Sequence, residues 1–422
     1  MKRNSARIGA ALLAGNLACG VFAAANERHV EAPGGVSPAS ACLSAAAWTK
    51  LDGARPRPAG AAALFADMAR RDVVLLGERH DAGDDHRWQV QALAALHAQR
   101  PEMVIGFEMF PRRVQPALDR WVAGELTVPQ FLEQSEWGKV WTYPAEFYLP
   151  LFEFARMNRI PMLALNVDQK LTQAIAAKGW DALAPAEREG VGRAAPPTGA
   201  YRDFLREVYR LHLAMPGRDD VGAASHAPGD ERAIERSIER GFGHFVESQT
   251  TWDRAMAEAL ARRAVAGADG AKPLLVGIIG SGHLRFGYGV PHQLRDLGVS
   301  RIGVLLPVAL DADCATIRNG LADAVFALPK QAAAAVEPPR LGVSLTGREG
   351  KVSIAEVMAD SLAEKSGLRN GDRLLSVAGQ PAKNIAQIIA AIRRQPGGTW
   401  LPLQVLRGDE TLDVVVKFPV RP

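Results

Sequence analysis

The chain has 422 residues, which suggests two or three domains rather than one compact unit. Hydrophobic residues make up 48% of the chain and charged residues 23%, a composition typical of globular proteins that excludes disorder throughout. The 50 basic and 46 acidic residues are interspersed and give a net charge of +4. This balance gives little support to an anionic membrane as partner, and we expect no nucleic acid partner.

The N-terminus has the pattern of a secretory signal peptide. Three basic residues among the first seven precede a weakly apolar stretch that ends in small residues, so we predict a signal peptide over 1–25. Cys19 is an alternative site of lipid attachment, although Asn16 stands where a large apolar residue is expected. No other segment approaches the roughly 18 to 20 apolar residues that a membrane span needs. We therefore predict an exported, periplasmic protein, with anchoring through Cys19 as the alternative.

Removal of the signal peptide would leave two cysteines, Cys42 and Cys314. An even number of cysteines in an oxidising compartment favours a disulfide between them. Two unrelated buried thiols are the alternative.

Strand-like and helix-like segments then alternate in the manner of a parallel α/β sheet. The expected strands are short, continuously apolar and rich in β-branched residues, as strands covered on both faces are. Four of them matter most, namely 73–76, 103–107, 160–165 and 274–279, and the expected helices include 86–98, 111–124, 144–158 and 244–265. We predict an α/β domain over 42–328 with a mainly parallel sheet flanked by helices.

Polar side chains follow each of these four strands. Two Gly-x-x-His motifs contribute Glu78 with His80 and Ser281 with His283, while Glu108 and Asn166 follow the other two strands. Ligands of open α/β sheets bind beyond the carboxyl ends of the strands, so we expect these residues to share one cleft. Asn166 has an alternative role as the cap of a helix that starts near Val167.

Histidine and carboxylate in one cleft suit either a metal ion with an activated water or an organic ligand. The metal hypothesis uses His80, His283, Glu108 and Glu78 as ligands, and a hydrolase would use the first three as catalytic residues. The sequence does not choose between the two chemistries. We expect Asp84 or Asp85 to cap the helix that follows His80, and His86 in its first turn to be solvated.

Aromatic residues concentrate between the second and third strands. Trp137, Trp141 and Tyr143 precede a predicted helix and could line a pocket for a flat apolar ligand. Because tyrosine is an axial ligand of haem iron in some proteins, Tyr143, Tyr148 and Tyr288 are candidates for that role.

These motifs resemble the ChaN family of haem-binding lipoproteins, within the larger Tiki and erythromycin-esterase-like group. The matching segments are 75–81, 106–110, 163–166 and 280–283 with 287–291, and the resemblance covers roughly 42–328. It implies haem or a related tetrapyrrole as ligand, held between two subunits of a homodimer, with a tyrosine on the iron and basic or imidazole groups on the propionates. The wider group includes metal-dependent hydrolases that use the two Gly-x-x-His motifs and a glutamate. The chain departs from the family in its poor lipid-attachment motif.

A change in composition marks a linker at 329–339, and residues 340–420 resemble the PDZ domains found beside periplasmic proteases. The resemblance rests on the segments 340–344, 361–368 and 371–375. It implies a small α+β, barrel-like domain in which Leu341, Gly342, Val343 and Ser344 bind a peptide or protein C-terminus. A helix over 384–394 would close the groove.

Three functions remain from the sequence. We favour an exported haem-binding protein of haem or iron acquisition, with His80, His283, Trp141 and one of the three tyrosines at the haem and the PDZ domain on a protein C-terminus. The second is a metal-dependent peptidase or esterase, and the third is a scaffold. A serine protease is not favoured, because Ser281 lacks the flanking glycines of a nucleophile elbow.

Overall fold

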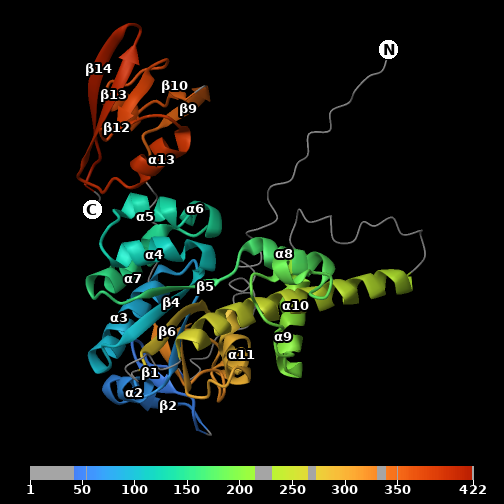
Figure 1. Cartoon of the computed structure of the whole chain (residues 1–422). Coiled ribbons are helices and arrows are strands. Elements are labelled where there is room, and N and C mark those ends of the chain that lie inside the picture. Colours follow the sequence, from blue (N-terminus) through green and yellow to red (C-terminus); the bar gives the residue numbers. More distant parts are fainter. Residues whose placement is uncertain are drawn as a thin grey trace, which may run out of the picture. The chain divides into compact units, whose positions relative to one another are not determined.

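The computed structural model describes residues 42–53, 55–213, 231–264, 272–329, 339–348 and 350–420. The chain divides into two compact units, an N-terminal unit of residues 1–330 and a C-terminal unit of residues 331–422 (Figure 1). The predicted signal peptide with Cys19, and most of the predicted linker, lie outside the described residues. In the described part of the chain, no helix combines the length and apolarity that crossing a membrane requires.

An eight-stranded sheet forms the centre of the N-terminal unit. Its strands are β1 (Trp48–Lys50), β2 (Arg57–Ala59), β3 (Val73–Glu78), β4 (Met103–Pro111), β5 (Met162–Asn166), β6 (Leu274–Gly280), β7 (Ile302–Ala309) and β8 (Ala324–Leu328). The spatial order is β2-β1-β8-β7-β3-β6-β4-β5. From β8 to β5 all neighbours are parallel, and β1 and β2 add an antiparallel edge. The predicted fold class is therefore confirmed, and the central strands β3, β6 and β4 end at the same edge.

Helices cover both faces of this sheet. They are α2 (Ala61–Met68), α3 (Gly83–Gln99), α4 (Gln115–Val122), α5 (Val128–Gln134), α6 (Trp137–Val140), α7 (Ala145–Met157), α8 (Gln169–Lys178), α9 (Gly199–Leu213), α10 (Glu231–Arg263) and α11 (Val290–Asp296). Short 3-10 turns lie at Arg112–Val114, Pro185–Arg188, Ser281–His283, Arg285–Gly287 and Cys314–Thr316. One core packs α2, α3, α4 and α7 on one face, and a second core packs α10 and α11 on the other.

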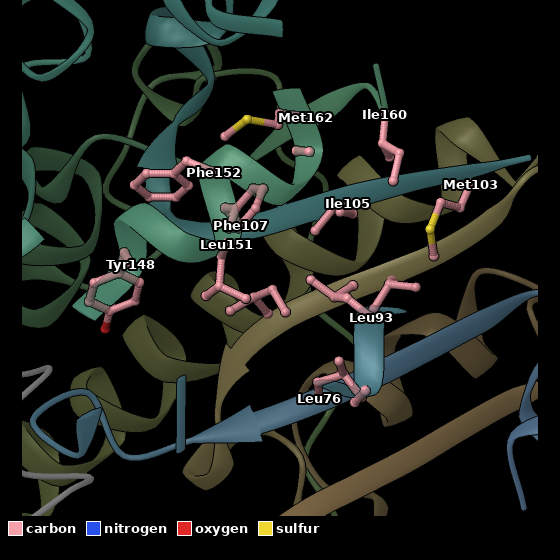
Figure 2. Close-up of a cluster of buried hydrophobic side chains, with 14 of the residues drawn as sticks. Leu76, Leu93, Met103, Ile105, Phe107, Tyr148, Leu151, Phe152, Ile160 and Met162 are labelled. Atoms are coloured by element: carbon pink, nitrogen blue, oxygen red, sulfur yellow. The ribbon is translucent and has the colours of Figure 1, made fainter. Parts of the chain in front are cut away.

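The alternation of buried side chains along β3 explains the two cores. Val74 and Leu76 belong to the first core, whereas Val73 and Leu75 belong to the second. Figure 2 shows part of the first core, where Leu76 and Leu93 lie with Tyr148 and Phe152 of α7. The hydroxyl of Tyr148 points away from the labelled apolar side chains, toward the site described below.

Some predicted boundaries differ from the structure. The strand predicted over 160–165 begins at Met162, and the helix predicted over 244–265 begins already at Glu231. The first strand continues to Glu78, so this glutamate belongs to β3 rather than to the loop after it. The extensions of β3 and α10 consist largely of polar residues, whereas the prediction rests on the apolar run of the strand and the apolar stripe of the helix.

The C-terminal unit is a small antiparallel domain. Its elements are β9 (Val343–Arg348), β10 (Lys351–Val357), α12 (Leu362–Lys365), β11 (Arg373–Val377), β12 (Gln380–Pro381), α13 (Ile385–Arg393), β13 (Trp400–Arg407) and β14 (Glu410–Lys417). The strand order β14-β13-β11-β10-β9 leaves β9 at an edge. A Cβ atom at Gly347 of β9 would lie 3.4 Å from Ile385 Cδ1, so α13 packs beside this edge strand, as predicted for a PDZ fold.

A disulfide joins Cys42 to Cys314, with 5.7 Å between their Cα atoms. The predicted pairing is thus present, and the alternative of two free thiols does not hold in this structure. The bond closes a loop with a sequence separation of 272 residues. A crosslink over so long a loop removes much conformational entropy from the unfolded chain.

Replacing both cysteines with serine is expected to lower the free energy of unfolding of the N-terminal unit by about 2–5 kcal/mol. Urea denaturation followed by far-UV circular dichroism measures this under oxidising conditions. In excess dithiothreitol the variant and the wild type should unfold at the same urea concentration. A difference that persists after reduction would mean that the substitutions act through packing instead.

Candidate functional site

The two Gly-x-x-His motifs meet because β3 and β6 are adjacent parallel strands. Their register places Gly77 opposite Ile279 and Glu78 opposite Gly280. A Cβ atom at Gly77 would lie 2.6 Å from Ser281 Oγ, so the first motif needs glycine to admit the second. The predicted cleft partners therefore come together at the ends of the central strands.

A hydrogen-bonded triplet, Tyr148–Glu78–His80, occupies the α7 side of this edge. The Tyr148 hydroxyl donates to Glu78 Oε1 over 2.9 Å, and His80 Nδ1 lies 2.8 Å from the same oxygen. His86 Nδ1 lies 3.2 Å from the other carboxylate oxygen. Burial alone would raise the pKa of Glu78, but the charge of His86 and the hydrogen bonds of both histidines hold this pKa well below its usual range.

A second triplet of the same chemistry, Tyr201–Asp253–His283, occupies the α10 side. The Tyr201 hydroxyl of α9 donates to Asp253 Oδ2 over 2.8 Å, and His283 Nδ1 lies 2.6 Å from Asp253 Oδ1. Burial alone would lower the pKa of His283, but the carboxylate of Asp253 outweighs it and raises this pKa. Burial and the neighbouring Asp253 charge raise the pKa of Tyr201, so its hydroxyl remains a proton donor.

Glu108 of β4 lies between the two triplets. Its Oε2 accepts a hydrogen bond of 2.6 Å from the backbone N–H of Gly280, and its Oε1 lies 3.6 Å from His283 Nε2. Among the described residues Oε1 has no hydrogen-bond partner although it is buried. Burying a carboxylate oxygen without a hydrogen bond costs folding free energy, and such unsatisfied groups are common at functional sites.

Both triplets fix the orientation of their histidine ring. A carboxylate can only accept a hydrogen bond, so each neutral imidazole carries its proton on Nδ1. The Nε2 atoms then face the centre: His283 Nε2 is near Glu108, and His80 Nε2 lies 3.0 Å from where a Cβ atom at Gly280 would be. Histidines that bind metals or organic ligands are held in this way by a carboxylate behind the ring.

Aromatic side chains line the His80 side of the site. Trp141 packs edge-on against the His80 ring at 4.9 Å between centroids, and Tyr143 packs against it at 5.3 Å. Trp141 is buried, and its indole Nε1 has no hydrogen-bond partner among the described residues. Trp137 was predicted in the same wall, but it lies in α6 and packs into the first core against Phe110. Trp141 and Tyr143 thus remain as the candidate contacts of a flat ligand.

The three candidate tyrosines occupy different environments. Tyr148 is fully buried and its hydroxyl is bonded to Glu78, so it serves to hold that carboxylate. Tyr143 and Tyr288 are half-buried, and Tyr288 stacks on Tyr201 at 5.3 Å. These two tyrosines flank the two triplets, one on each side of the sheet edge.

Two expectations for the start of α3 are wrong. His86 is buried rather than solvated, because its ring lies against Glu78 and Tyr148. Asp85 does not cap α3 with its side chain; its buried carboxylate accepts hydrogen bonds from the backbone and guanidinium of Arg79. Asp84 forms an ion pair with Arg87 instead. Both acidic residues therefore act within tertiary contacts that helix-capping rules do not include.

Asn166 joins the site to the edge strand β5. Its amide Nδ2 donates to the backbone oxygen of Glu108 over 2.8 Å, and its Oδ1 accepts from Val167 N. The N-cap position of the following helix α8 is Asp168, not Asn166. Asn166 therefore fixes the backbone beside Glu108, and the capping alternative does not hold.

The sequence-based prediction missed Asp253 and Tyr201. Asp253 had a readable signal, because it follows Val246 by seven residues and precedes Leu260 by seven, which places it on the buried face of α10. A carboxylate in an apolar stripe indicates a buried partner. Tyr201 had no such signal, since it meets Asp253 only through the packing of α9 on α10.

The residues at this edge of the sheet fit a haem group better than a metal ion bound by protein side chains alone. In the part of the chain that the structure describes, no group of three or more His, Cys, Asp or Glu side chains is arranged to hold a metal ion. Imidazole nitrogens, phenol oxygens and flat aromatic faces together fit haem, whose iron accepts histidine or tyrosine as axial ligand. The predicted set His80, Glu78, Glu108 and His283 does gather at one edge. His80 is bonded there to Glu78, but His283 is bonded to Asp253, and Glu108 lies between the two histidine sites.

The predicted peptide-binding segment lies at the start of the edge strand β9. Gly342 has a φ of +78°, which glycine adopts without strain, and its carbonyl accepts a hydrogen bond from Met358 N. The carbonyl of Leu341 accepts from Ala363 N over 2.9 Å. Val343 and Ser344 begin β9 and pair with β10 on one side only. The other side of the strand is the sheet edge, which a peptide could extend.

Family models match both units. The model described as haem-binding uptake, Tiki superfamily, ChaN matches residues 64–294, and a PDZ domain model matches residues 339–418. A curated relative from Ralstonia nicotianae, named as a zinc metalloprotease, is 44% identical over 57 residues. This match covers 14% of the chain, and the chain spans only 12% of that relative's length.

Two solved structures are similar to parts of the chain. The ChaN protein of Campylobacter jejuni, described with cofacial haem binding, is 18% identical with a TM-score of 0.47 and covers 67% of this chain and 96% of its own. The PDZ domain of HtrA3, bound to a phage-derived ligand, is 19% identical with a TM-score of 0.17 and covers 18% of this chain and 82% of its own.

Substituting Gly280 with alanine is expected to displace His80 and to destabilise the N-terminal unit by about 1–3 kcal/mol. The added methyl group would lie 2.8 Å from His80 Cε1, and the Glu78 hydrogen bond prevents the ring from turning away. Thermal unfolding measures the loss of stability. Gly243→Ala is the matched control, because its Cβ would meet no atom within 4 Å and alanine favours the α10 helix. Equal stability of the Gly280→Ala variant and the wild type would contradict the tight packing described.

Proposed function

The chain belongs to the ChaN family of haem-binding uptake proteins in the Tiki superfamily and carries a C-terminal PDZ domain, and from this we propose that it binds haem at the carboxyl ends of its central strands. The observation that carries the proposal is the pair of carboxylate-bound histidines, His80 and His283, which converge beside Glu108. We further propose that the protein is exported to the periplasm and acts in haem or iron acquisition.

Tyr143, Trp141 and His80 are the proposed contacts on one side of the haem. Trp141 and Tyr143 offer flat aromatic faces beside the His80 ring, and Tyr143 is partly exposed, so a ligand can reach it from outside. His283 and Tyr288 are the corresponding groups on the other side of the sheet edge. Two half-buried tyrosines at one edge also suit a ligand shared between two copies, so we propose that haem promotes a homodimer.

A metal-dependent hydrolase is the second candidate. The specific observation in its favour is Glu108, whose buried Oε1 has no hydrogen-bond partner among the described residues and lies near His283 Nε2. Such a carboxylate could act as a general base toward a bound water. Because the described residues lack a three-ligand metal arrangement, we place this function after haem binding.

The PDZ domain is proposed to bind a protein C-terminus at β9. Leu341 and Gly342 form the loop whose backbone amides would receive the terminal carboxylate, and the peptide would add as a strand beside Val343 and Ser344. Ile389 of α13 is 38% exposed and lies one helical turn after Ile385, which packs beside Gly347 of β9, so we expect it to face this route. The domain would then act as an adaptor that brings the haem-binding unit to a partner.

Titrating the chain without its leader with haemin is expected to shift the Soret band at stoichiometric ligand. His80→Ala and Tyr143→Phe should each weaken the affinity about tenfold or more, because each removes a proposed contact. His97→Ala is the control, because this half-buried histidine lies in the last turn of α3, whereas His80 precedes its first turn. An unchanged haemin spectrum in the wild type would exclude haem binding, and light scattering with and without haemin tests the dimer.

Metal content and hydrolysis are measured on the same preparation. If His283→Ala removes bound zinc, manganese or iron together with ester or peptide hydrolysis, the second candidate replaces the first. Wild type without bound metal and without hydrolysis would exclude the hydrolase.

Fluorescence anisotropy with a labelled peptide ending in Val–COOH is expected to show binding, and the amide form of the same peptide should bind at least about tenfold more weakly. Ile389→Asp should abolish binding by placing a charge in the apolar groove. Val415→Asp is the matched control, because Val415 is similarly exposed on β14, the opposite edge of the sheet. Equal binding of acid and amide would contradict recognition of a C-terminus.

A further inference from the structure

The net charge of the chain lies entirely in its C-terminal part. Residues 339–422 contain 12 basic and 8 acidic residues, whereas residues 1–338 contain 38 of each. The formal charge of +4 therefore belongs to the PDZ domain and the last residues after it. A positive excess confined to one small domain is a local electrostatic feature that the composition of the whole chain conceals.

Part of this charge surrounds a pocket that is separate from the peptide groove. The pocket has a volume of about 450 Å³, and Arg340, Arg393 and Arg394 are in its lining. Arg340 and Arg393 are exposed and pair with no carboxylate in the described part of the chain. Leu362 and Phe418 give the pocket an apolar floor. Guanidinium groups around an apolar floor fit a ligand that joins an anionic group to an apolar part.

A peptide in the groove would not fill this pocket. The lining includes Pro396 and Gly397 from beyond α13, and none of the groove residues Val343, Ser344 or Ile389. A peptide C-terminus stops at the carboxylate loop, and Arg340 directly precedes this loop. The pocket can therefore take a ligand of its own.

Exposed apolar side chains lie close in sequence to lining residues of the pocket. Trp400 is 65% exposed and pairs in register with Lys417, next to the lining residue Phe418. The Lys417 ammonium lies 5.1 Å from the centre of the Trp400 ring. Val420 is 79% exposed and follows Pro419, another lining residue. Tryptophan beside basic residues is the combination found at membrane–water interfaces, where the indole enters the headgroup layer and the cations meet lipid phosphates.

We propose that the arginine-lined pocket of the PDZ domain, aided by the exposed side chains of Trp400, Lys417 and Val420, binds the phosphate headgroups of an anionic phospholipid membrane. Arg340, Arg393 and Arg394 contact the phosphate, and Trp400 and Val420 insert at the headgroup level. The binding is electrostatic in its larger part, since each basic residue near an anionic leaflet contributes to it and salt screens it. It does not depend on haem or on a peptide in the groove.

Cosedimentation of residues 26–422 with phosphatidylglycerol–phosphatidylcholine vesicles tests the proposal, with phosphatidylcholine vesicles as reference. The wild type should bind the anionic vesicles, and raising the salt from 0.05 to 0.5 M should weaken the binding. The double variant Arg393→Gln/Arg394→Gln should lose about tenfold or more in partitioning. Trp400→Ala should also weaken it, while circular dichroism confirms that each variant is folded.

The control Lys351→Gln/Lys383→Gln removes the same charge from exposed positions outside the pocket and should keep the binding within about twofold. An equal loss in both double variants would overturn the proposal, because the attraction would then follow net charge alone. Equal binding to neutral vesicles would overturn it as well. Binding of an acidic peptide at the arginines without any vesicle binding would assign the surface to a protein partner instead.

Discussion

The parallel pairing of β3 with β6 is the constraint on which the candidate site depends. Its register sets Glu78 beside Gly280 and brings the two Gly-x-x-His motifs into contact although some two hundred residues separate them. Side chains alternate between the two faces of a strand, so a slip of one residue would turn Glu78 toward α10 instead of α7. This register requires glycine in both motifs. A side chain at Gly77 would collide with Ser281 of the second motif, and a side chain at Gly280 would collide with His80 of the first.

Around this pairing, the protein buries several ionisable groups without leaving their charges uncompensated. Each carboxylate behind a histidine also accepts a hydrogen bond from a buried tyrosine, Tyr148 on one side and Tyr201 on the other. Such bonds offset the cost of removing a carboxylate from water. The rings are thus fixed before any ligand arrives, which reduces the ordering cost of binding. Among the described residues, Glu108 keeps a buried carboxylate oxygen without a hydrogen bond, at the point where the two triplets face each other.

The two units divide the chemistry of the chain between them. Residues 1–338 contain equal numbers of basic and acidic residues, and the candidate site holds its ionisable groups in buried pairs, whereas the PDZ domain carries the positive excess of the chain. The first unit offers a site of fixed geometry, and the second offers a free strand edge and exposed arginines. With the proposed peptide site and membrane surface, the PDZ domain would concentrate the proposed haem site near membrane-associated partners.

The sequence by itself determined the fold class, the PDZ domain and most of the site. Apolar runs identified β3, β4, β5 and β6, and polar residues directly after or within these strands identified His80, Glu108, Asn166 and His283. This works because local side-chain patterns report strand burial, and because parallel strands bring their carboxyl ends to one edge.

Only the tertiary structure decided which groups lie behind the histidines. Asp253 and Tyr201 come from α10 and α9, and Tyr148 from α7, at helix positions whose partners depend on how those helices pack on the sheet. The same packing buried His86 and paired Asp85 with Arg79, against the local rules of helix capping. Sequence patterns describe neighbours along the chain, whereas these contacts join residues up to 70 positions apart and form only when the two cores assemble.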